Sequence, residues 1–96
     1  MSKAYKKLDP LLHTPLRLAI ISFLVSNGES NFNGLKKVTE ATSGNLSVQL
    51  KKLEEAGYVA IKKSFKNNYQ HTAVRITQKG IRAFEKYVNA IKQYLE

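Results

Sequence analysis

The 96-residue chain contains no cysteine, no tryptophan, one methionine and two prolines. Without cysteine it can form no disulfide, and thiol redox sensing, cysteine nucleophiles and thiolate-bound metals are excluded. A long hydrophobic run is also missing, because the longest apolar stretch, residues 16–25, is interrupted by Arg17 and Ser22 and is too short to span a bilayer. The N-terminal MSKAYKK is basic but has no apolar segment of the kind that a signal peptide needs. We therefore expect a cytoplasmic protein with no membrane partner and a frayed basic tail over residues 1–7.

Acidic residues are scarce, since the chain has 7 Asp and Glu against 16 Lys and Arg, a formal net charge of +9. So strong a field on a short chain favours a polyanionic partner such as DNA or RNA. The acids are scattered, His13 and His71 lie far apart, and no glycine-rich phosphate loop is present. Because catalysis needs a nucleophile with a base or paired carboxylates, we expect no enzyme, no metal site and no cofactor. The length predicts a single domain over residues 1–96.

The most informative stretch is TSGNLSVQLKKLEEAGY, which predicts a helix over residues 43–56. Thr42 is a favourable N-cap residue, and Gly57 stands where a left-handed residue most often ends a helix. Leucines recur at i, i+4 and i+7 along one stripe of this helix. The stripe consists of Leu46, Leu50 and Leu53.

The opposite side of this helix carries short polar and basic residues, concentrated in its first half. Gly44 and Ser43 are weak helix formers, and they suit a first turn that something approaches closely. Small polar groups followed by lysines suit the floor of a DNA major groove, although ordinary surface helices also combine a leucine stripe with a lysine face. The candidate DNA contacts on this recognition helix are Ser43, Gly44, Asn45, Ser47, Val48, Lys51 and Lys52.

Two helices are expected before the recognition helix. The first begins at Thr14, which is a favourable N-cap residue, and Pro15, which suits the first turn of a helix. It ends at Asn27-Gly28. It is apolar over most of its circumference, which predicts the central core helix. Asp9 and Pro10 form the same pair of a cap residue and a first-turn proline, and they predict a shorter helical start over residues 8–12.

A short helix is expected over residues 32–40, beginning at Ser30. Only a tight turn at Ala41-Thr42 separates it from the recognition helix, and two helices joined in this way form a helix-turn-helix unit.

After Gly57 the apolar period changes to two, which predicts a β-hairpin, or wing, over about residues 58–76. We expect the first strand to run to Phe65, a loop over residues 66–71, and the second strand over residues 72–76. The loop contains no acidic residue. The candidate DNA contacts in the wing are Lys63, Lys66, Asn68 and Arg75.

The last helix is expected over about residues 78–95, with Thr77 as its cap. Its apolar residues follow steps of 3, 4, 3 and 4, a heptad seam that indicates pairing with a second copy of the chain. The alternative is that this helix packs only on the first long helix. The candidate dimer contacts are Ile81, Phe84, Tyr87, Val88, Ile91, Tyr94 and Leu95.

Three blocks of sequence resemble the small winged-helix transcriptional regulators of bacteria and archaea related to the MarR and ArsR groups. The blocks are HTPLRLAIISFL, TSGNLSVQLKKLEEAGYV and TAVRITQKGIRAF, and the resemblance covers about residues 8–95. It implies a mainly α fold with a small β-hairpin, a winged helix-turn-helix with a C-terminal dimerisation helix. Metal-sensing members of these groups carry clusters of Cys or His. This chain has no Cys and only two separate histidines, so it departs from that pattern.

The function that these observations predict is sequence-specific binding of double-stranded DNA by a homodimer that regulates transcription, as a repressor of a pseudo-palindromic site. Two alternatives remain open: a chromatin-like protein that coats DNA without sequence preference, and a winged-helix module that docks another protein. No residues stand out as a site for a small-molecule effector.

Overall fold

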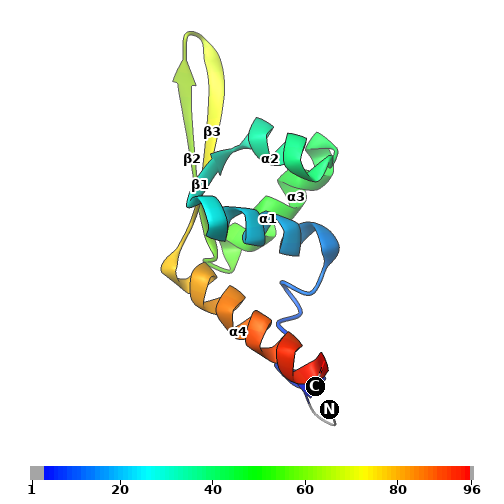
Figure 1. The fold of residues 1–96 in the computed structure, drawn as a ribbon. Helices are drawn as coiled ribbons and strands as arrows, with labels where there is room; N and C mark the ends of the chain where they lie inside the picture. The colour runs from blue at the N-terminus through cyan, green and yellow to red at the C-terminus, as the bar shows by residue number, and fades with distance from the viewer. Residues whose placement is uncertain (1–3, 96) are drawn as a thin grey trace.

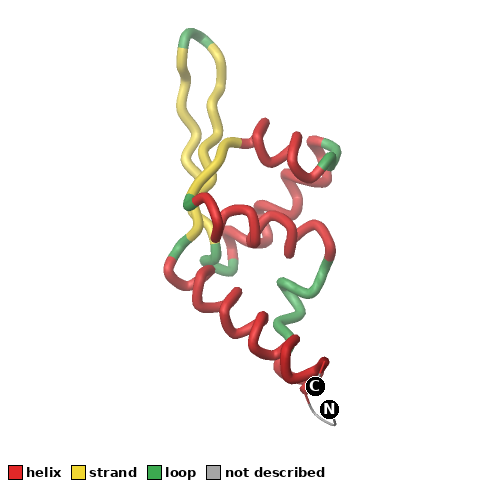
Figure 2. The backbone as a smooth tube through the Cα atoms, viewed as in Figure 1, coloured by secondary structure: helices red, strands yellow, loops and turns green. Residues whose placement is uncertain are grey.

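A computed structural model describes residues 4–95, with four α-helices and a three-stranded antiparallel sheet (Figure 1). The molecule is elongated, 54 × 25 × 21 Å, with the hairpin at one end and both described chain ends at the other (Figure 2). This arrangement is the predicted winged helix. In chain order the elements are the 3₁₀ helix η1 (Ala4–Lys7), α1 (Pro15–Asn27), β1 (Glu29–Asn31), α2 (Phe32–Thr39), α3 (Ser43–Glu55), β2 (Val59–Lys66), β3 (Tyr69–Ile76) and α4 (Gln78–Leu95).

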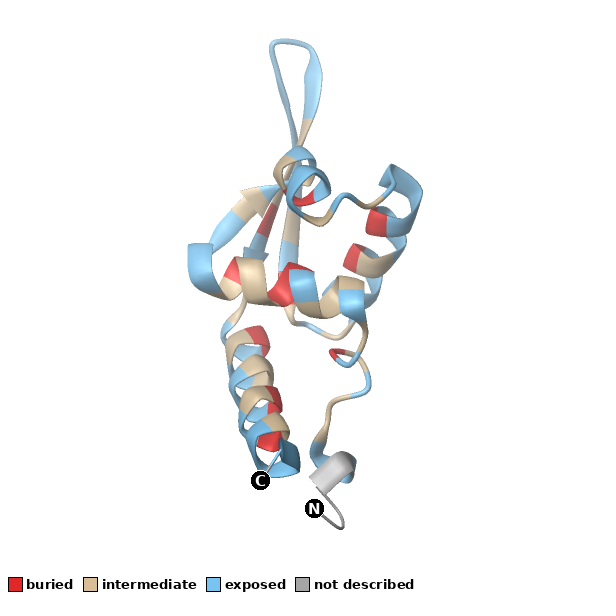
Figure 3. Ribbon diagram, turned by 45° about the vertical axis from the view of Figure 1, so that its right-hand side comes forward, coloured by how far each residue is buried: buried red, intermediate tan, exposed pale blue. Residues whose placement is uncertain are grey.

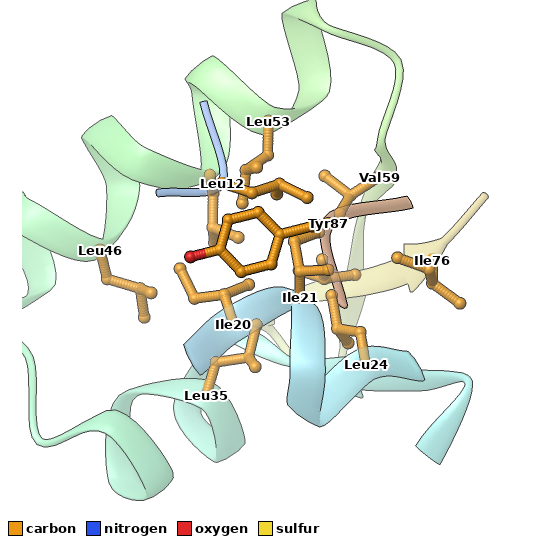
Figure 4. Close-up of a cluster of buried hydrophobic side chains, with 12 residues drawn as sticks. Leu12, Ile20, Ile21, Leu24, Leu35, Leu46, Leu53, Val59, Ile76 and Tyr87 are labelled. Carbon is orange, nitrogen blue, oxygen red and sulfur yellow. The ribbon is translucent and has the colours of Figure 1, made fainter. Parts of the chain in front are cut away.

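The hydrophobic core lies around α1, as predicted. Ile20, Ile21 and Leu24 of α1 are fully buried, and side chains from α2, α3 and the base of the sheet pack around them (Figure 4). Thr14 takes the predicted cap position with extended backbone, but only its carbonyl caps, accepting from Leu18, and its side chain forms no cap hydrogen bond. Pro15 occupies the first turn, where its missing N–H is not needed. The remaining fully buried large side chains are Leu12, Leu35, Leu46, Leu53 and Val74.

The segment before α1 does not form the helical start that we expected over residues 8–12. Asp9 instead closes a turn, because its Oδ1 accepts from the backbone N–H of Leu11 at 2.9 Å and its carbonyl accepts from that of His13 at 2.9 Å. This is the bonding of the predicted cap, with the side chain accepting from the second residue of the turn and the carbonyl accepting the i+4 bond, but the helical bonding stops after one turn. The turn directs Leu12 into the core.

The expected basic tail is only partly described. Residues 1–3 lie outside the described residues, and residues 4–7 form η1. Lys7 Nζ donates to Gln93 Oε1 of α4 at 3.1 Å, so the start of the described chain is packed beside its end.

The helix expected over residues 32–40 is confirmed as α2, but it begins at a different cap. Asn31 accepts from the backbone N–H of Gly34 at 2.7 Å, whereas Ser30 lies in β1. β1 is a strand that we did not predict. It spans only three residues and forms by pairing with β3, Ser30 opposite Val74, so its sequence shows no period of its own.

The hairpin is confirmed, but its loop is shorter than expected. The turn consists of Asn67 and Asn68 alone, with φ of 51° and 67°, as in a type I′ turn. β3 therefore begins at Tyr69, paired with Lys66, and residues 69–71 belong to a strand rather than to the loop. β3 is central in the order β1-β3-β2.

Helix α4 begins at the predicted cap, since Thr77 Oγ1 accepts from the backbone N–H of Gly80 at 3.0 Å. A Cβ on Gly80 would lie 2.2 Å from the carbonyl oxygen of Tyr58, so the first turn of α4 packs directly on the backbone between α3 and β2. No helix in residues 4–95 combines the length and apolar character needed to cross a membrane.

Candidate nucleic-acid interface

Helix α3 presents the predicted contact residues on its exposed side. Thr42 Oγ1 accepts from the backbone N–H of Asn45 at 3.2 Å and so caps the helix. The leucine stripe is buried, with Leu46 and Leu53 at 0% exposure and Leu50 at 3%, and this packing fixes which side of α3 faces outward. The residues that the structure places on the exposed side are Ser43, Gly44, Asn45, Ser47, Val48, Lys51 and Lys52.

A chain of hydrogen bonds connects one of these residues to α1. Arg17 donates from Nε to the carbonyl of Leu11 and from Nη1 to Gln49 Oε1. Gln49 Nε2 then donates to Asn45 Oδ1 at 3.0 Å. Arg17 and Gln49 were not among the predicted site residues. The helical i, i+4 spacing of Asn45 and Gln49 allowed their contact to be anticipated, but the approach of Arg17 depends on how α1 packs on α3.

This chain of bonds orients both amides. A guanidinium has donors only, so the oxygen of Gln49 must face Arg17 and its nitrogen must face Asn45. Asn45 accepts that bond through its oxygen and turns its NH₂ group away. The outward polar group of Asn45 is therefore a hydrogen-bond donor.

A groove separates α3 from one face of the hairpin. It brings Ser47 and Lys51 of α3 together with Lys63 of β2, three residues predicted as DNA contacts. Strand alternation places Gln70 and Thr72 on the same hairpin face as Lys63, and we did not predict these two. The groove is lined by Phe32, Ser47, Leu50, Lys51, Glu54, Ile61, Lys63, Gln70 and Thr72.

The other predicted wing residues are not in this groove. Cross-strand pairs place Lys66 and Arg75 on the opposite hairpin face from Lys63, Lys66 at the tip and Arg75 at the base. Arg75 is paired with Glu29 of β1, so a carboxylate is its cross-strand neighbour. Asn68 lies in the turn itself. The structure thus distributes the predicted wing contacts over two faces.

The hairpin protrudes from the body, and all of residues 62–70 are exposed (Figure 3). No acidic residue occurs between Glu55 and Glu85, so every formally charged side chain of the hairpin is positive. Phe65 and Tyr69 near the tip are 77% and 78% exposed. We did not include these aromatic residues among the predicted contacts.

The joint between α3 and β2 is held by a tyrosine. Tyr58 Oη donates to Asp9 Oδ2, and Lys79 Nζ lies 5.8 Å from the centre of the Tyr58 ring. Burial raises the pKa of Tyr58 to about 12, and the hydrogen bond to Asp9 and the negative charge of Asp9 add to the shift. The interaction connects the N-terminal turn to the point where the helical and β parts of the site meet.

Tyr87 of α4, which we predicted to contact a second copy of the chain, lies in the core instead. Its side chain is 5% exposed and packs inside the core, where its hydroxyl lies 2.8 Å from His13 Nδ1 (Figure 4). Gly80, Tyr87 and Ala90 lie at helical spacing and form the buried side of α4, which packs within the chain. A heptad pattern does not distinguish packing inside a chain from packing between copies, which explains the error.

The neighbouring stripe of α4 is more accessible. Ile81, Phe84 and Ile91 are half-buried against the core, and Val88 is half-buried outside it. Tyr94 and Leu95 at the end of the helix are 39% and 79% exposed. These six predicted residues remain candidates for contact with a second copy.

The described residues offer no group of three or more His, Cys, Asp or Glu side chains that could hold a metal ion. His13 is occupied by its contact with Tyr87, and His71 lies opposite Ser64 in the hairpin.

The sequence pattern of a family described as a winged helix DNA-binding domain matches residues 16–95. An uncharacterised protein of Methanocaldococcus jannaschii is 39% identical over 83 residues, which cover 86% of this chain and 90% of that protein. A transcriptional regulator homologue of Pyrococcus horikoshii OT3 has a similar structure, with a TM-score of 0.89 and 27% identity over 99% of this chain and 95% of that one. MepR of S. aureus, solved in complex with DNA, shares the fold with a TM-score of 0.75 and 18% identity, over 99% of this chain and 77% of that one.

Proposed function

The chain belongs to the family of winged-helix DNA-binding domains, and on this premise we propose that it regulates transcription by binding a specific duplex DNA sequence as a homodimer. The observation that carries the proposal is the exposed polar and basic side of α3 next to a basic hairpin. A capped helix of this kind fits a major groove, and the hairpin then lies along the adjacent backbone.

Contacts to phosphates would set the position of the protein on the duplex. Lys51 and Lys52 at the middle of α3 and Lys66 at the hairpin tip are exposed and suit this role. The groove between α3 and the hairpin has a lysine on each wall, Lys51 and Lys63, and these two charges suit one strand of the sugar-phosphate backbone.

The first half of α3 would recognise the bases of the DNA sequence. Ser43 and Ser47 can donate or accept hydrogen bonds, and Val48, 51% exposed, suits contact with a thymine methyl group. Asn45 Oδ1 already accepts from Gln49, which holds the amide in one orientation with its NH₂ group outward. Asn45 would therefore select a base with an acceptor in the major groove, and guanine, with N7 and O6, is the best match. Bidentate recognition of adenine would need a second bond to the oxygen that already accepts from Gln49.

Pairing of two chains would use the accessible stripe of α4 that ends at Tyr94 and Leu95. The heptad seam of α4, which ends at Tyr94 and Leu95 with 39% and 79% exposure, supports this pairing. The two-fold dimer would read a pseudo-palindrome whose half-sites lie about 10 bp apart. We propose repression as the outcome, because occupancy of a promoter is enough to block transcription.

Selection of bound duplexes from a random library, followed by sequencing, tests this proposal. The expected result is an enriched inverted repeat, with affinity falling about 10³- to 10⁵-fold between 50 and 200 mM salt if roughly six to ten phosphates are neutralised. A bound pool without enrichment would instead support DNA coating, which the net charge of +9 also favours. Absence of any bound pool would favour a protein-docking module.

The homodimer has its own test. Val88→Glu would place a charge in the accessible stripe of α4, and we expect it to shift the sedimentation coefficient from dimer to monomer. Lys52→Glu, on α3, is the matched control and should leave the dimer intact. A wild-type chain that sediments as a monomer at every concentration would contradict this part of the proposal.

A further inference from the structure

Arg17 of α1 makes two hydrogen bonds inside the protein, and both go to uncharged groups. Its Nε donates to the backbone carbonyl of Leu11, and its Nη1 donates to Gln49 Oε1 of α3. The side chain is half-buried. Because neither partner carries a charge, these two bonds use the direction of the guanidinium donors and not an ion pair.

The turn before α1 sets the position of this guanidinium. Asp9 Oδ1 accepts from the backbone N–H of Leu11 at 2.9 Å, which holds Leu11 and its carbonyl in place. A guanidinium is a planar fork, so its other N–H groups point in fixed directions once Nε is bound to Leu11. One of them reaches Gln49. The turn therefore fixes the direction from which a donor approaches α3.

A donor at this place selects one of two arrangements of the amides on α3. In the observed arrangement, Gln49 turns its oxygen to Arg17 and its Nε2 donates to Asn45 Oδ1 at 3.0 Å, so the NH₂ group of Asn45 faces outward. In the reversed arrangement, Asn45 would donate to the oxygen of Gln49 and turn its own oxygen outward. That arrangement would place the NH₂ group of Gln49 against Arg17, where two donors would meet.

We propose that Arg17 determines which base Asn45 selects, as a positioning residue that acts through Gln49 and does not itself contact DNA. This inference rests on the proposed function, because it requires α3 to read bases in the major groove. With a donor at position 17, the NH₂ group of Asn45 faces the bases and matches the acceptors of guanine. With an acceptor at position 17, the oxygen of Asn45 would face the bases and match the amino group of adenine or cytosine.

The test changes the hydrogen-bonding character of residue 17. In-vitro selection with the wild type and with Asn45→Ala first identifies the base pair that Asn45 reads. Fluorescence anisotropy then measures binding to four labelled duplexes that differ only at that pair. Because phosphate attraction is the same for all four, the ratio of their affinities does not depend on the net charge of the variant.

Three substitutions of Arg17 give three different expectations. Arg17→Lys, which still only donates, should keep guanine as the preferred base. Arg17→Met, which cannot donate, should reduce the discrimination at this pair about tenfold. Arg17→Glu, whose carboxylate only accepts, should shift the preference to adenine or cytosine. A side chain that served only the stability of the fold would not reverse a base preference.

Two further variants check that Arg17 acts through Gln49. The double variant Arg17→Met/Gln49→Leu should lose no more discrimination than either single variant, because each change breaks the same chain of bonds. Arg82→Met, which replaces an exposed arginine of α4, is the matched control and should leave the preference unchanged. Thermal unfolding of each variant verifies that the fold is retained. If Arg17→Glu does not fold, Gln49→Glu keeps a partner for Arg17 and places an acceptor beside Asn45, with the same expected shift.

Three outcomes would overturn the inference while the proposed function would stand. An unchanged selected sequence for Asn45→Ala would show that Asn45 reads no base. A guanine preference that persists in Arg17→Met and Arg17→Glu would show that Asn45 is oriented without Arg17. An equal loss of affinity for all four duplexes in Arg17→Met, with the slope of log K against log salt reduced by about one unit, would identify Arg17 as a phosphate contact. A wild type that selects no DNA sequence would instead reject the proposed function itself.

Discussion

Helix α3 and the outer half of the hairpin both carry candidate DNA contacts, but they are held in place in different ways. α3 rests on three leucines that are at most 3% exposed, whereas all of residues 62–70 are exposed (Figure 3). Packing therefore fixes the outward side of α3, and only the backbone ladder and the turn fix the hairpin tip. Side chains at the tip are free of the core, so core packing places no constraint on their identity.

The largest expected effect is a difference between the two regions in how much a truncated side chain lowers the stability of the fold. Leu53→Ala removes a fully buried side chain beneath α3 and should lower the free energy of unfolding by about 2–5 kcal/mol. Phe65→Ala, the matched truncation at the hairpin tip, should change it by less than about 0.5 kcal/mol. Urea denaturation followed by circular dichroism measures both. Similar losses for the two variants would mean that the tip is packed against the body, contrary to the comparison.

The joint between the two regions should be nearly as sensitive. Gly80→Ala would place a Cβ 2.2 Å from the carbonyl oxygen of Tyr58 and 2.8 Å from a methyl carbon of Ile76. The backbone must shift to relieve these contacts, and we expect a loss of about 1–3 kcal/mol in the free energy of unfolding. Gly44→Ala, with open space around its Cβ position, is the control and should not destabilise the chain. A neutral Gly80→Ala would show that α4 can move away from the joint.

Within α3, the orientation of Asn45 can be changed without touching the proposed contact itself. Gln49→Leu removes the hydrogen bond that holds the Asn45 amide in its orientation, so the amide can turn to bind adenine through two bonds. In-vitro selection should show the preferred base at one position shift toward adenine, with discrimination changing by about 1–3 kcal/mol.

The control for this prediction is Gln93→Leu, which removes a glutamine of α4 that contacts Lys7. It should leave the selected sequence unchanged. An identical selected sequence for Gln49→Leu and the wild type would mean that Gln49 does not set the specificity of Asn45.

The smallest expected effect concerns Tyr58 at the joint and appears only in alkaline solution. The folded chain holds this proton up to a pKa of about 12, whereas the unfolded tyrosine ionises near its ordinary value of 10. The unfolded state therefore loses its proton first, so the stabilisation is complete below pH 10 and is lost as the pH rises toward 12. Solvent screening of the partly exposed ring should keep the loss below about 1 kcal/mol.

Urea midpoints at pH 9 and pH 11 measure this effect, with Tyr58→Phe expected to decline less steeply than the wild type. Tyr69→Phe, which removes an exposed hydroxyl, is the control and should follow the wild type. Equal pH dependence in Tyr58→Phe and the wild type would exclude Tyr58 as the group responsible.

Local sequence signals, such as capping residues and apolar periodicity, predicted much of the fold. Caps at Thr42 and Thr77 and the leucine stripe of α3 act within a few residues, so the order of helices and the bounds of α3 and α4 followed from them. The exposed contact residues of α3 followed from the same stripe, because burying one side of a helix exposes the other.

Tertiary structure decided the features that depend on distant residues. β1 exists only because β3 lies beside it, and Tyr87 belongs to the core only because His13 and α1 approach α4. The orientation of the Asn45 amide likewise depends on Arg17, 28 positions earlier in the chain. The sequence by itself determined which local elements form, since propensity and capping act over a single turn. Only the packing of those elements determined which of their surfaces remain available for contact, because burial is a property of the whole fold.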